Sequence, residues 1–505
     1  MKLLSGSMNP VPPLGLAYVA AALRSAGHEV YVIDAIGEAP LQTNPFNKEK
    51  GIVTNGLNYK QIFEKIEEGT ALIGFSMMFT ENWLSDRALM EYLGKQLPHI
   101  TFFAGGEHIS AYPELWLEQS PHLKICVTGE GESTSVELAK ALEKNQSLDN
   151  VEGIVFRSST GSIVTTPKNR RIRELEDINR PAWDLFPINK YNEHNLKWGV
   201  NRGNSLPILA TRGCPYECTF CSSPQMWGTK YSMRSPKDVA DEIEFFQNKY
   251  SISNFDFYDL TAIIKKEWII EFADEINKRN LNFTWQIPGG TRSEAINAIV
   301  AKRLYESGCR NITYAPESGS PEVLHLIKKK ISIDKMLQSM RYSYREKMNI
   351  KINIILGFPD ETHKHLWETI WFLIKCSWVG AHDSVPAIFS PYPGSKLFER
   401  LHNEGRVKLE NDEYFWGILD SNDFLGGKFY NNHLGKNTLR VYFFLYLFFF
   451  FGSNYLFRPW RIIKNISNII KGRQESRGEA AIIEIMKRRK FVEVEDYTAG
   501  ELNAA

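Results

Sequence analysis

The sequence predicts an α/β protein in three parts: a Rossmann-like doubly wound domain, a full or partial β/α barrel of the TIM type, and a mainly helical C-terminal region. Three observations lead to this prediction. Strand and helix patterns alternate over residues 1–147, the alternation returns over residues 201–405, and residues 406–505 have mainly helical patterns and are partly very apolar. A chain of 505 residues is also longer than one compact core usually requires.

The composition excludes several classes of protein. Lys and Arg total 60 against 59 Asp and Glu, a formal net charge of +1, so no overall basic field favours a nucleic-acid partner. Residues 1–13 lack the unbroken apolar core of a secretory signal. Of six cysteines, three lie within eight residues, which is not the spacing of a disulfide framework. We therefore expect a cytoplasmic protein.

The first domain begins with a helical pattern at residues 14–24, and its strands are expected at residues 29–34, 71–76, 101–104 and 125–127. Small or Gly-rich sequence follows each of the last three. In doubly wound sheets, ligands bind just outside the carboxyl ends of the strands. The candidate binding residues at these ends are Ser76, Gly105, Gly106, His108, Gly129, Glu130 and Gly131.

Residues 148–200 are expected to connect the two domains. Residues 151–167 have the pattern of a β-hairpin with its turn at residues 159–161, and the charged stretch that follows resembles a linker. From residue 201 the strand-then-helix order returns. Six parallel strands are expected near Ile208, Asn254, Phe283, Asn311, Lys351 and Ala387.

The C-terminal region has an unusual apolar segment. Residues 441–451 are intensely apolar but reach only about half of the roughly 20 residues that a membrane span requires. Further on, Ile462, Ile463, Ile466, Ile469 and Ile470 fall on one helical face, as in a helix that lies in a membrane interface. The equally favoured alternative is a helix that docks its isoleucines on the barrel. Membrane contact through residues 441–471 is therefore a hypothesis.

Three cysteines carry the strongest chemical signal in the chain. Cys214, Cys218 and Cys221 are separated by three and then two residues, and soft thiolate ligands so close together select zinc or an iron-sulfur cluster. A structural zinc site normally needs a fourth ligand nearby, but the first following histidine is His325. Three ligands leave one iron of a [4Fe-4S] cluster open to a small molecule, so the spacing favours a catalytic cluster.

With Phe220 directly before the third cysteine, this segment resembles the signature of the radical S-adenosylmethionine (SAM) superfamily. The resemblance implies that the open iron binds SAM. It also implies that an electron from a flavodoxin, ferredoxin or other reductase breaks the SAM sulfur-carbon bond to give a 5′-deoxyadenosyl radical. In this account Phe220 packs near the adenine.

Further matches to the same superfamily follow in the expected order, each just after a predicted strand. The resemblance implies that they contact SAM, although each has an ordinary alternative as a turn, cap or surface residue. These residues are Asp259, Arg292, Glu317, Ser318 and Gly357.

The Gly-rich ends of the first domain resemble the cobalamin-binding domain that precedes many radical SAM barrels. No Asp-x-His-x-x-Gly segment occurs, so a histidine ligand to cobalt of that sort is not expected. His108 is a possible substitute, but a histidine after Gly-Gly is more often a loop residue. Residues 1–13 leave room for only a shortened first strand, so cobalamin binding stays open at this point.

Together, these resemblances predict a cobalamin-dependent radical SAM methyltransferase that uses a [4Fe-4S] cluster, SAM and cobalamin to methylate an unactivated carbon. One alternative is an oxidative cyclase of the anaerobic Mg-protoporphyrin monomethyl ester cyclase type. Another is a non-catalytic protein that binds a metal and a ligand. The expected substrate is a small molecule, and the apolar C-terminal region makes a lipid-like one attractive.

Overall fold

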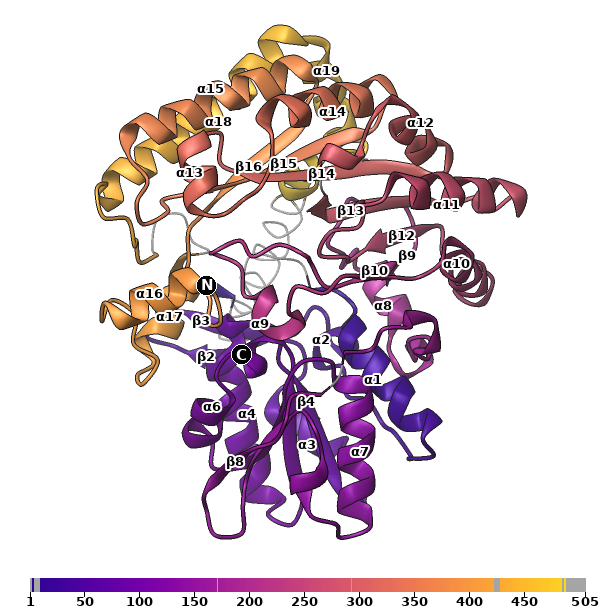
Figure 1. The fold of residues 1–505 in the computed structure, drawn as a ribbon, viewed down its shortest axis with the longest axis vertical. Coiled ribbons are helices and arrows are strands. Elements are labelled where there is room, and N and C mark those ends of the chain that lie inside the picture. Colours follow the sequence, from indigo (N-terminus) through magenta and orange to yellow (C-terminus); the bar gives the residue numbers. More distant parts are fainter. Residues whose placement is uncertain are drawn as a thin grey trace, which may run out of the picture.

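The structure is a computed structural model, and it describes residues 2–3, 10–169, 171–291, 293–421, 427–483 and 486. It has a front half built on one sheet and a barrel half built on another (Figure 1). Helix α9 (Ser223–Trp227) lies where the two halves meet (Figure 1).

The front half contains a five-stranded sheet in the order β4-β5-β6-β7-β8. Strands β4 (Leu72–Ser76), β5 (Thr101–Gly105) and β6 (Leu123–Val127) are parallel. Strands β7 (Ile154–Arg157) and β8 (Ile163–Thr165) continue the sheet in antiparallel fashion. The predicted hairpin is thus present, but it extends the front sheet and does not belong to a separate linker.

Helices accompany this sheet as the doubly wound prediction requires, and they include α1 (Leu14–Ser25), α3 (Tyr59–Glu64), α4 (Trp83–Gln96), α5 (Glu107–Ala111), α6 (Pro113–Gln119) and α7 (Gly131–Glu143). The strand expected at residues 29–34 is absent, and this segment has no regular secondary structure. Its last residue, Asp34, caps the short helix α2 (Ala35–Glu38). A separate small sheet has the order β1-β3-β2, with β1 (Lys2–Leu3), β2 (Thr43–Asn47) and β3 (Ile52–Asn55).

The barrel half contains all six predicted strands, and each neighbouring pair is parallel. Their order is β16-β15-β14-β13-β12-β9, so the described strands form an open, partial barrel. The bounds are β9 (Ser205–Ile208), β12 (Asn254–Phe257), β13 (Thr284–Thr291), β14 (Cys309–Glu317), β15 (Asn349–Leu356) and β16 (Asp383–Ile388).

Helices cover the outer face of this sheet (Figure 1), and capping side chains fix where several of them begin. Ser235, Asn297 and Ser332 each accept a hydrogen bond from a first-turn backbone N–H. The helices are α10 (Pro236–Tyr250), α11 (Lys266–Lys278), α12 (Ala298–Glu306), α13 (Pro321–Leu326), α14 (Ile333–Arg345) and α15 (His363–Val379).

The two halves share one hydrophobic core. Trp83 and Trp116 of the front half lie in the same buried cluster as Phe358, Phe389 and Phe398 of the barrel half. Burying large aromatic groups at this boundary removes a large apolar area from water. The core therefore holds the two carboxyl strand edges in a fixed relation to each other.

The C-terminal region is helical, as predicted, with α16 (Lys396–Asn403), α17 (Glu413–Ser421), α18 (Lys436–Phe457) and α19 (Trp460–Ile470). Helix α18 has 22 residues, twice the length of the apolar run from which it was predicted, and by length and composition alone it could cross a membrane. It packs beside α15, with Tyr442, Tyr446 and Phe450 buried on its inner face (Figure 1).

Helix α19 decides between the two alternatives for the isoleucines. Ile463 is 75% exposed and Ile470 is 79% exposed, whereas Arg461 and Asn468 are buried. The alternative in which the isoleucines dock on the barrel is therefore wrong.

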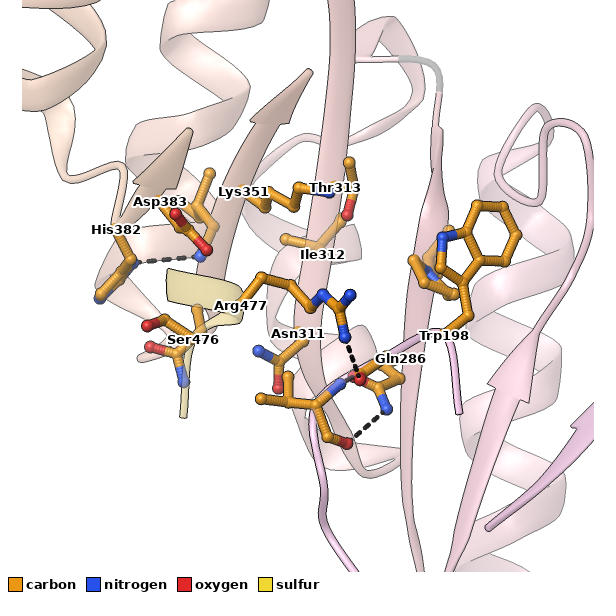
Figure 2. A pocket seen from close by; sticks show the side chains of 16 residues that line it. Trp198, Gln286, Asn311, Ile312, Thr313, Lys351, His382, Asp383, Ser476 and Arg477 are labelled. Carbon is orange, nitrogen blue, oxygen red and sulfur yellow. Dashed lines mark hydrogen bonds between the residues drawn. The ribbon is translucent and has the colours of Figure 1, made fainter. Parts of the chain in front are cut away.

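The amino ends of the barrel strands are closed by a segment far along the chain. A cavity there is lined by Gln286, Lys351 and Asp383 from three strands and by Trp198 and Arg477 from outside the sheet (Figure 2). Arg477 Nη1 donates to the carbonyl of Gly199 over 3.1 Å. This end lies opposite the carboxyl strand ends, from which all the predicted site residues of this half follow.

Candidate functional site at the junction of the two halves

The three cysteines lie on a loop whose ends are held together. Strand β10 (Thr211–Arg212) pairs antiparallel with β11 (Ser232–Met233) and closes the base of the loop. Gly213 has φ +80°, and a Cβ atom there would lie 2.2 Å from the carbonyl oxygen of Lys230, so only glycine fits. We call residues 213–231 the cluster loop.

The thiols of the cluster loop are not arranged as ligands of a single metal ion. Among the described residues, no three or more His, Cys, Asp or Glu side chains are close enough together to hold one ion. Structural zinc needs four such ligands at about 2.0–2.3 Å. The ligands of a four-iron cluster bind different irons, so they stand farther apart. All three thiols are partly exposed on one short loop.

Phe220 lies against the barrel half in the region predicted for SAM. Its ring centroid is 5.7 Å from that of Phe358, and Lys329 Nζ lies 5.9 Å from the centroid of Phe220. Lys329 also forms an ion pair with Glu317 over 3.0 Å. Glu317 has φ +69°, a left-handed conformation that is rare outside glycine and is often found at functional sites. The structure thus brings Phe220 and Glu317 together through Lys329.

Ser318 and Gly357 contact neighbouring residues of the barrel half and of helix α18. Ser318 Oγ lies 3.2 Å from Thr369 Oγ1 and accepts a hydrogen bond from the Ser320 amide over 3.1 Å. A Cβ atom on Gly357 would approach Leu439 of α18 at 3.1 Å. These two residues shape the loops after β14 and β15.

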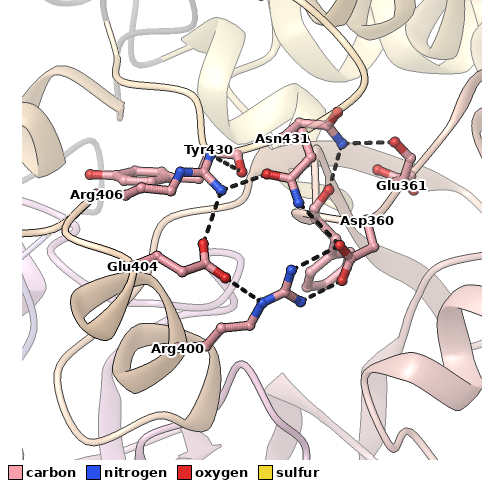
Figure 3. A network of polar contacts seen from close by, with 9 residues as sticks. Asp360, Glu361, Arg400, Glu404, Arg406, Tyr430 and Asn431 are labelled. Atoms are coloured by element: carbon pink, nitrogen blue, oxygen red, sulfur yellow. Dashed lines mark hydrogen bonds and ion pairs between the residues drawn. The ribbon is translucent and has the colours of Figure 1, made fainter.

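The loop after β15 is fixed by a network of polar contacts (Figure 3). Arg400 of α16 donates to both carboxylate oxygens of Asp360, at 2.6 and 3.0 Å. Asn431 Nδ2 donates to the carbonyl of Glu361 over 2.8 Å, and Arg406 donates to the carbonyl of Tyr430 over 2.6 Å. A bidentate Arg-carboxylate pair holds both partners in one geometry.

Asp259 lies after β12 and supports the base of the cluster loop. Its buried carboxylate accepts hydrogen bonds from the Ala210 amide over 3.1 Å and from the Thr211 hydroxyl. Burial raises the pKa of Asp259 to about 6. Arg292, the remaining SAM candidate, lies outside the described residues.

Several buried polar atoms at the carboxyl strand ends lack a hydrogen-bond partner. They include Thr219 Oγ1 in the cluster loop, Thr291 Oγ1 at the end of β13 and Glu361 Oε1 after β15. An unpaired buried polar atom costs about 1–3 kcal/mol. The amino, carboxylate and hydroxyl groups of SAM are suitable partners for such atoms, so this edge fits the molecule.

In the front half, the predicted binding residues gather at one sheet edge. Ser76 pairs in register with Gly105, and Gly105 pairs with Val127, so the three strand ends are level. A Cβ atom on Gly106, at φ +120°, would lie 2.4 Å from the carbonyl oxygen of Met77. A Cβ atom on Gly129, at φ +76°, would lie 3.7 Å from the carbonyl oxygen of Met226 of α9. This edge therefore faces the segment that follows the cysteines.

Exposed apolar residues at this edge fit a large, flat organic ligand. Met78 is 40% exposed and Phe79 is 52% exposed, directly after β4. Glycines beside them permit a close approach to the backbone.

His108 lies inside an aromatic core. Its ring centroid is 4.1 Å from that of Trp116 and 5.2 Å from that of Trp83. Its Nδ1 lies 3.2 Å from Thr80 Oγ1, and burial lowers the pKa of His108 to about 3. These contacts are those of a neutral packing residue and give no support to a role as cobalt ligand.

Glu130 forms polar contacts across the junction of the two halves. Arg212, directly before the cluster loop, donates to Glu130 Oε1 over 3.2 Å and also to Glu132. The other oxygen of Glu130 accepts the Ile172 amide over 2.8 Å. The carboxylate of Glu130 therefore supports the cluster loop, whereas Gly131 after it begins α7.

A second contact crosses the junction one residue after the last cysteine. The Ser222 hydroxyl donates to the carboxylate of Glu107, which directly follows Gly105 and Gly106. Sequence reasoning missed Arg212, Glu132, Ser222, Glu107 and Lys329. The first four lie beside predicted site residues in the sequence, and that position is the only signal that could have suggested them, whereas Lys329 has no such signal.

Comparison with known protein families agrees with this geometry. Residues 208–373 match the radical SAM superfamily, and residues 4–139 match the B12 binding domain. The chain thus combines a radical SAM domain with a B12 binding domain. The predictions of an enzyme and of a [4Fe-4S] cluster, SAM and cobalamin as cofactors are thereby confirmed.

The enzyme is similar to proteins of more than one activity. An uncharacterized methyltransferase of Pyrococcus horikoshii is 28% identical over 390 residues, which cover 77% of this chain and 78% of the relative. An anaerobic magnesium-protoporphyrin IX monomethyl ester cyclase of Rubrivivax gelatinosus is 26% identical over 408 residues, covering 78% of this chain and 67% of the relative.

The fold of the enzyme is also similar to a solved structure. The radical SAM methyltransferase TsrM of Kitasatospora setae, determined with cobalamin and a [4Fe-4S] cluster bound, aligns with a TM-score of 0.63 and 17% identity. The alignment covers 80% of this chain and 77% of that one. The predicted fold class is confirmed.

Proposed function

We propose that this enzyme methylates an unactivated carbon of a small molecule. The supporting observation is the contact between its two cofactor regions. Ser222 follows the cysteines, Glu107 follows the glycines of the B12 binding domain, and the two side chains are hydrogen-bonded. When bound, the cluster would supply the electron for reductive cleavage of SAM, and cobalamin would supply methyl transfer. Because the two cofactor regions are in direct contact, SAM cleavage and methyl transfer could both act on one substrate bound between them.

Each predicted residue has a place in this proposal. Cys214, Cys218 and Cys221 would bind the cluster. Phe220, Asp259, Arg292, Glu317, Ser318 and Gly357 would line or support the SAM region, and Ser76, Gly105, Gly106, Gly129 and Gly131 would approach cobalamin. His108 and Glu130 would support these loops through packing and ion pairing. With both cofactors bound, the loops of the junction would help to exclude water from reactive species.

Three finer predictions belong to the same proposal. The electron donor would be a flavodoxin, a ferredoxin or another reductase, and the enzyme would work in the cytoplasm. The substrate would be lipid-like, which the exposed apolar C-terminal helices support.

A cyclase is the second candidate, since a cyclase is among the relatives of this chain. The two functions differ in their products. Methyl transfer should release S-adenosylhomocysteine together with 5′-deoxyadenosine and move the SAM methyl group into the product. Cyclisation should release 5′-deoxyadenosine without S-adenosylhomocysteine.

The test uses the anaerobically reconstituted enzyme with cobalamin, a chemical reductant, SAM labelled in its methyl carbon, and a small-molecule extract. We expect label in an extracted molecule and both nucleoside products. Cys218→Ala should reduce both to background, whereas Cys126→Ala, at a buried cysteine of the front sheet, should retain them. Label-free product with 5′-deoxyadenosine alone would favour the cyclase, and no SAM cleavage would exclude both functions.

A further inference from the structure

Three helices of the barrel half carry large apolar side chains on their outer surfaces. On α15 these are Trp371 and Trp378, on α18 Phe444 and Phe448, and on α19 Ile463 and Ile470, and each of the six is more than half exposed. We call these six residues the apolar face. Isolated exposed apolar residues are ordinary, but an extended apolar surface indicates an interaction site.

The three helices form one continuous surface. Trp367 of α15 contacts Tyr442 and Phe449 of α18, with ring centroids 6.0 and 5.9 Å apart. Trp378 of α15 contacts Phe457 at the end of α18 over 4.9 Å. Helix α19 begins three residues later, and all three helices lie at the end of the molecule away from the B12 binding domain (Figure 1).

The amphipathicity of α19 is reversed relative to a helix that docks on a protein core. Arg461 points inward and donates to the carbonyls of Gly380 and Ala381 over 3.0 and 2.6 Å. Asn468 donates to Glu479 over 2.8 Å. The inner face of α19 is thus satisfied by polar contacts, and its isoleucines remain for an apolar partner outside the protein.

The charge of this region identifies the class of partner. From Lys436 to Arg473 the chain has seven Lys and Arg residues and no Asp or Glu. Arg458 and Arg461 are buried, and the other five are at least partly exposed, although Lys464 pairs with Glu475 over 2.6 Å. Basic residues beside exposed Trp, Phe and Ile are the composition that binds anionic membrane surfaces.

We propose that the apolar face docks on an anionic lipid bilayer, with α15, α18 and α19 lying along the membrane plane. Helix α18 does not cross the bilayer in this arrangement. Tyr446 of its inner face is hydrogen-bonded to Ser384, and Arg458 at its end donates to the carbonyl of Ser377 over 2.6 Å. A helix attached to the barrel along its whole length enters lipid only on its outer side. The proposal does not depend on the methyl-transfer reaction.

The experiment is co-sedimentation of the full chain with phosphatidylcholine vesicles, with and without phosphatidylglycerol. We expect binding to the anionic vesicles that weakens as salt is raised. The variant Phe448→Ser/Ile463→Ser/Ile470→Ser should bind at least about tenfold less, since less apolar area enters the lipid. The control Leu41→Ser/Ile299→Ser changes residues that are 62% and 63% exposed elsewhere and should bind as the wild type does.

Two further measurements keep the result interpretable. Lipids brominated in their acyl chains should quench part of the tryptophan fluorescence, and Trp371→Phe/Trp378→Phe should lose that part. Gel filtration with light scattering tests the competing occupant, a second copy of the chain. Failure of the wild type to bind, equal binding by the serine variant, or a dimer that this variant dissociates without any loss of vesicle binding would each overturn the proposal.

Discussion

Glu361 is a buried carboxyl group that has no cation beside it among the contacts described. Its Oε2 accepts the Gly357 amide over 2.6 Å, whereas Oε1 has no hydrogen-bond partner. Burial raises the pKa of Glu361 to about 8, because the charged form loses hydration that the backbone amides of Gly357 and Phe358 only partly replace. The stability of the loop after β15 should therefore depend on whether the Glu361 carboxyl group is protonated.

The pH dependence of stability should report this carboxyl group. In the unfolded chain its pKa is near 4.5, so its contribution is fully present below pH 4.5 and is lost as pH rises to about 8. Glu361→Gln should flatten the decline of the unfolding free energy across this window, measured by urea denaturation at several pH values. Glu137→Gln, on the exposed side of α7, should leave the decline unchanged. An unaltered decline in Glu361→Gln would contradict the assignment.

At the scale of residues, the sequence is most informative where chemistry sets the spacing. Three ligands of one cluster must lie close together, so the separation of the three cysteines predicts their role. Arg212 and Glu130 are ordinary charged residues in the sequence, and their pairing joins positions 82 apart. No local pattern encodes such a contact, since it depends on how two domains meet.

At the scale of elements, the ion pairs of Arg212 attach the start of the cluster loop to helix α7. The side chain of Arg212 is 5% exposed, and those of Glu130 and Glu132 are 3% and 10% exposed. Glu130 has a second, more distant guanidinium partner, since Arg171 Nε lies 3.6 Å from its Oε2. Removing one partner of a buried ion pair is strongly destabilising, although an intact buried pair contributes little net free energy.

We predict that Arg212→Ala lowers the unfolding free energy by about 3–5 kcal/mol, because it removes the guanidinium partner of Glu132 and leaves Glu130 with only the more distant Arg171 in a poorly hydrated site. The matched control is Arg24→Ala, which removes an Arg-Asp pair whose side chains are 45% and 40% exposed. The control should cost only about 0–1 kcal/mol. Denaturation of both variants in urea provides the comparison, and equal losses would show that the junction does not depend on Arg212.

The element boundaries show why prediction succeeded for the barrel and failed elsewhere. The six barrel strands alternate regularly with helical patterns along residues 201–405, a clear local signal. Residues 29–34 have a similar pattern but no strand. Helix α18 continues past Gly452 and Asn454 to Phe457. Asn454 Nδ2 donates to the Ala381 carbonyl over 2.6 Å, and this tertiary contact stabilises the helix there. Composition alone cannot reveal such a contact.

At the scale of the whole molecule, the front and barrel halves share one hydrophobic core and should unfold together. A ligand that binds one half should therefore stabilise both. We predict that cobalamin at about 100 times its dissociation constant raises the unfolding free energy by about 2.7 kcal/mol. The Cys214→Ala/Cys218→Ala/Cys221→Ala variant should show the same increase, because the front edge binds no cluster. Urea denaturation with and without cobalamin measures both, and an increase that vanishes in the variant would contradict separate sites.

The apolar face lies at the end of the molecule far from the B12 binding domain, and this position affects how cofactors and substrate reach the enzyme. Docking there would orient the molecule, with the barrel helices against lipid and the front half projecting into water (Figure 1). Cobalamin and an electron carrier would then arrive by diffusion in three dimensions. A substrate dissolved in the bilayer would arrive from the opposite direction by diffusion in two, so the enzyme would stand between two reservoirs that do not mix.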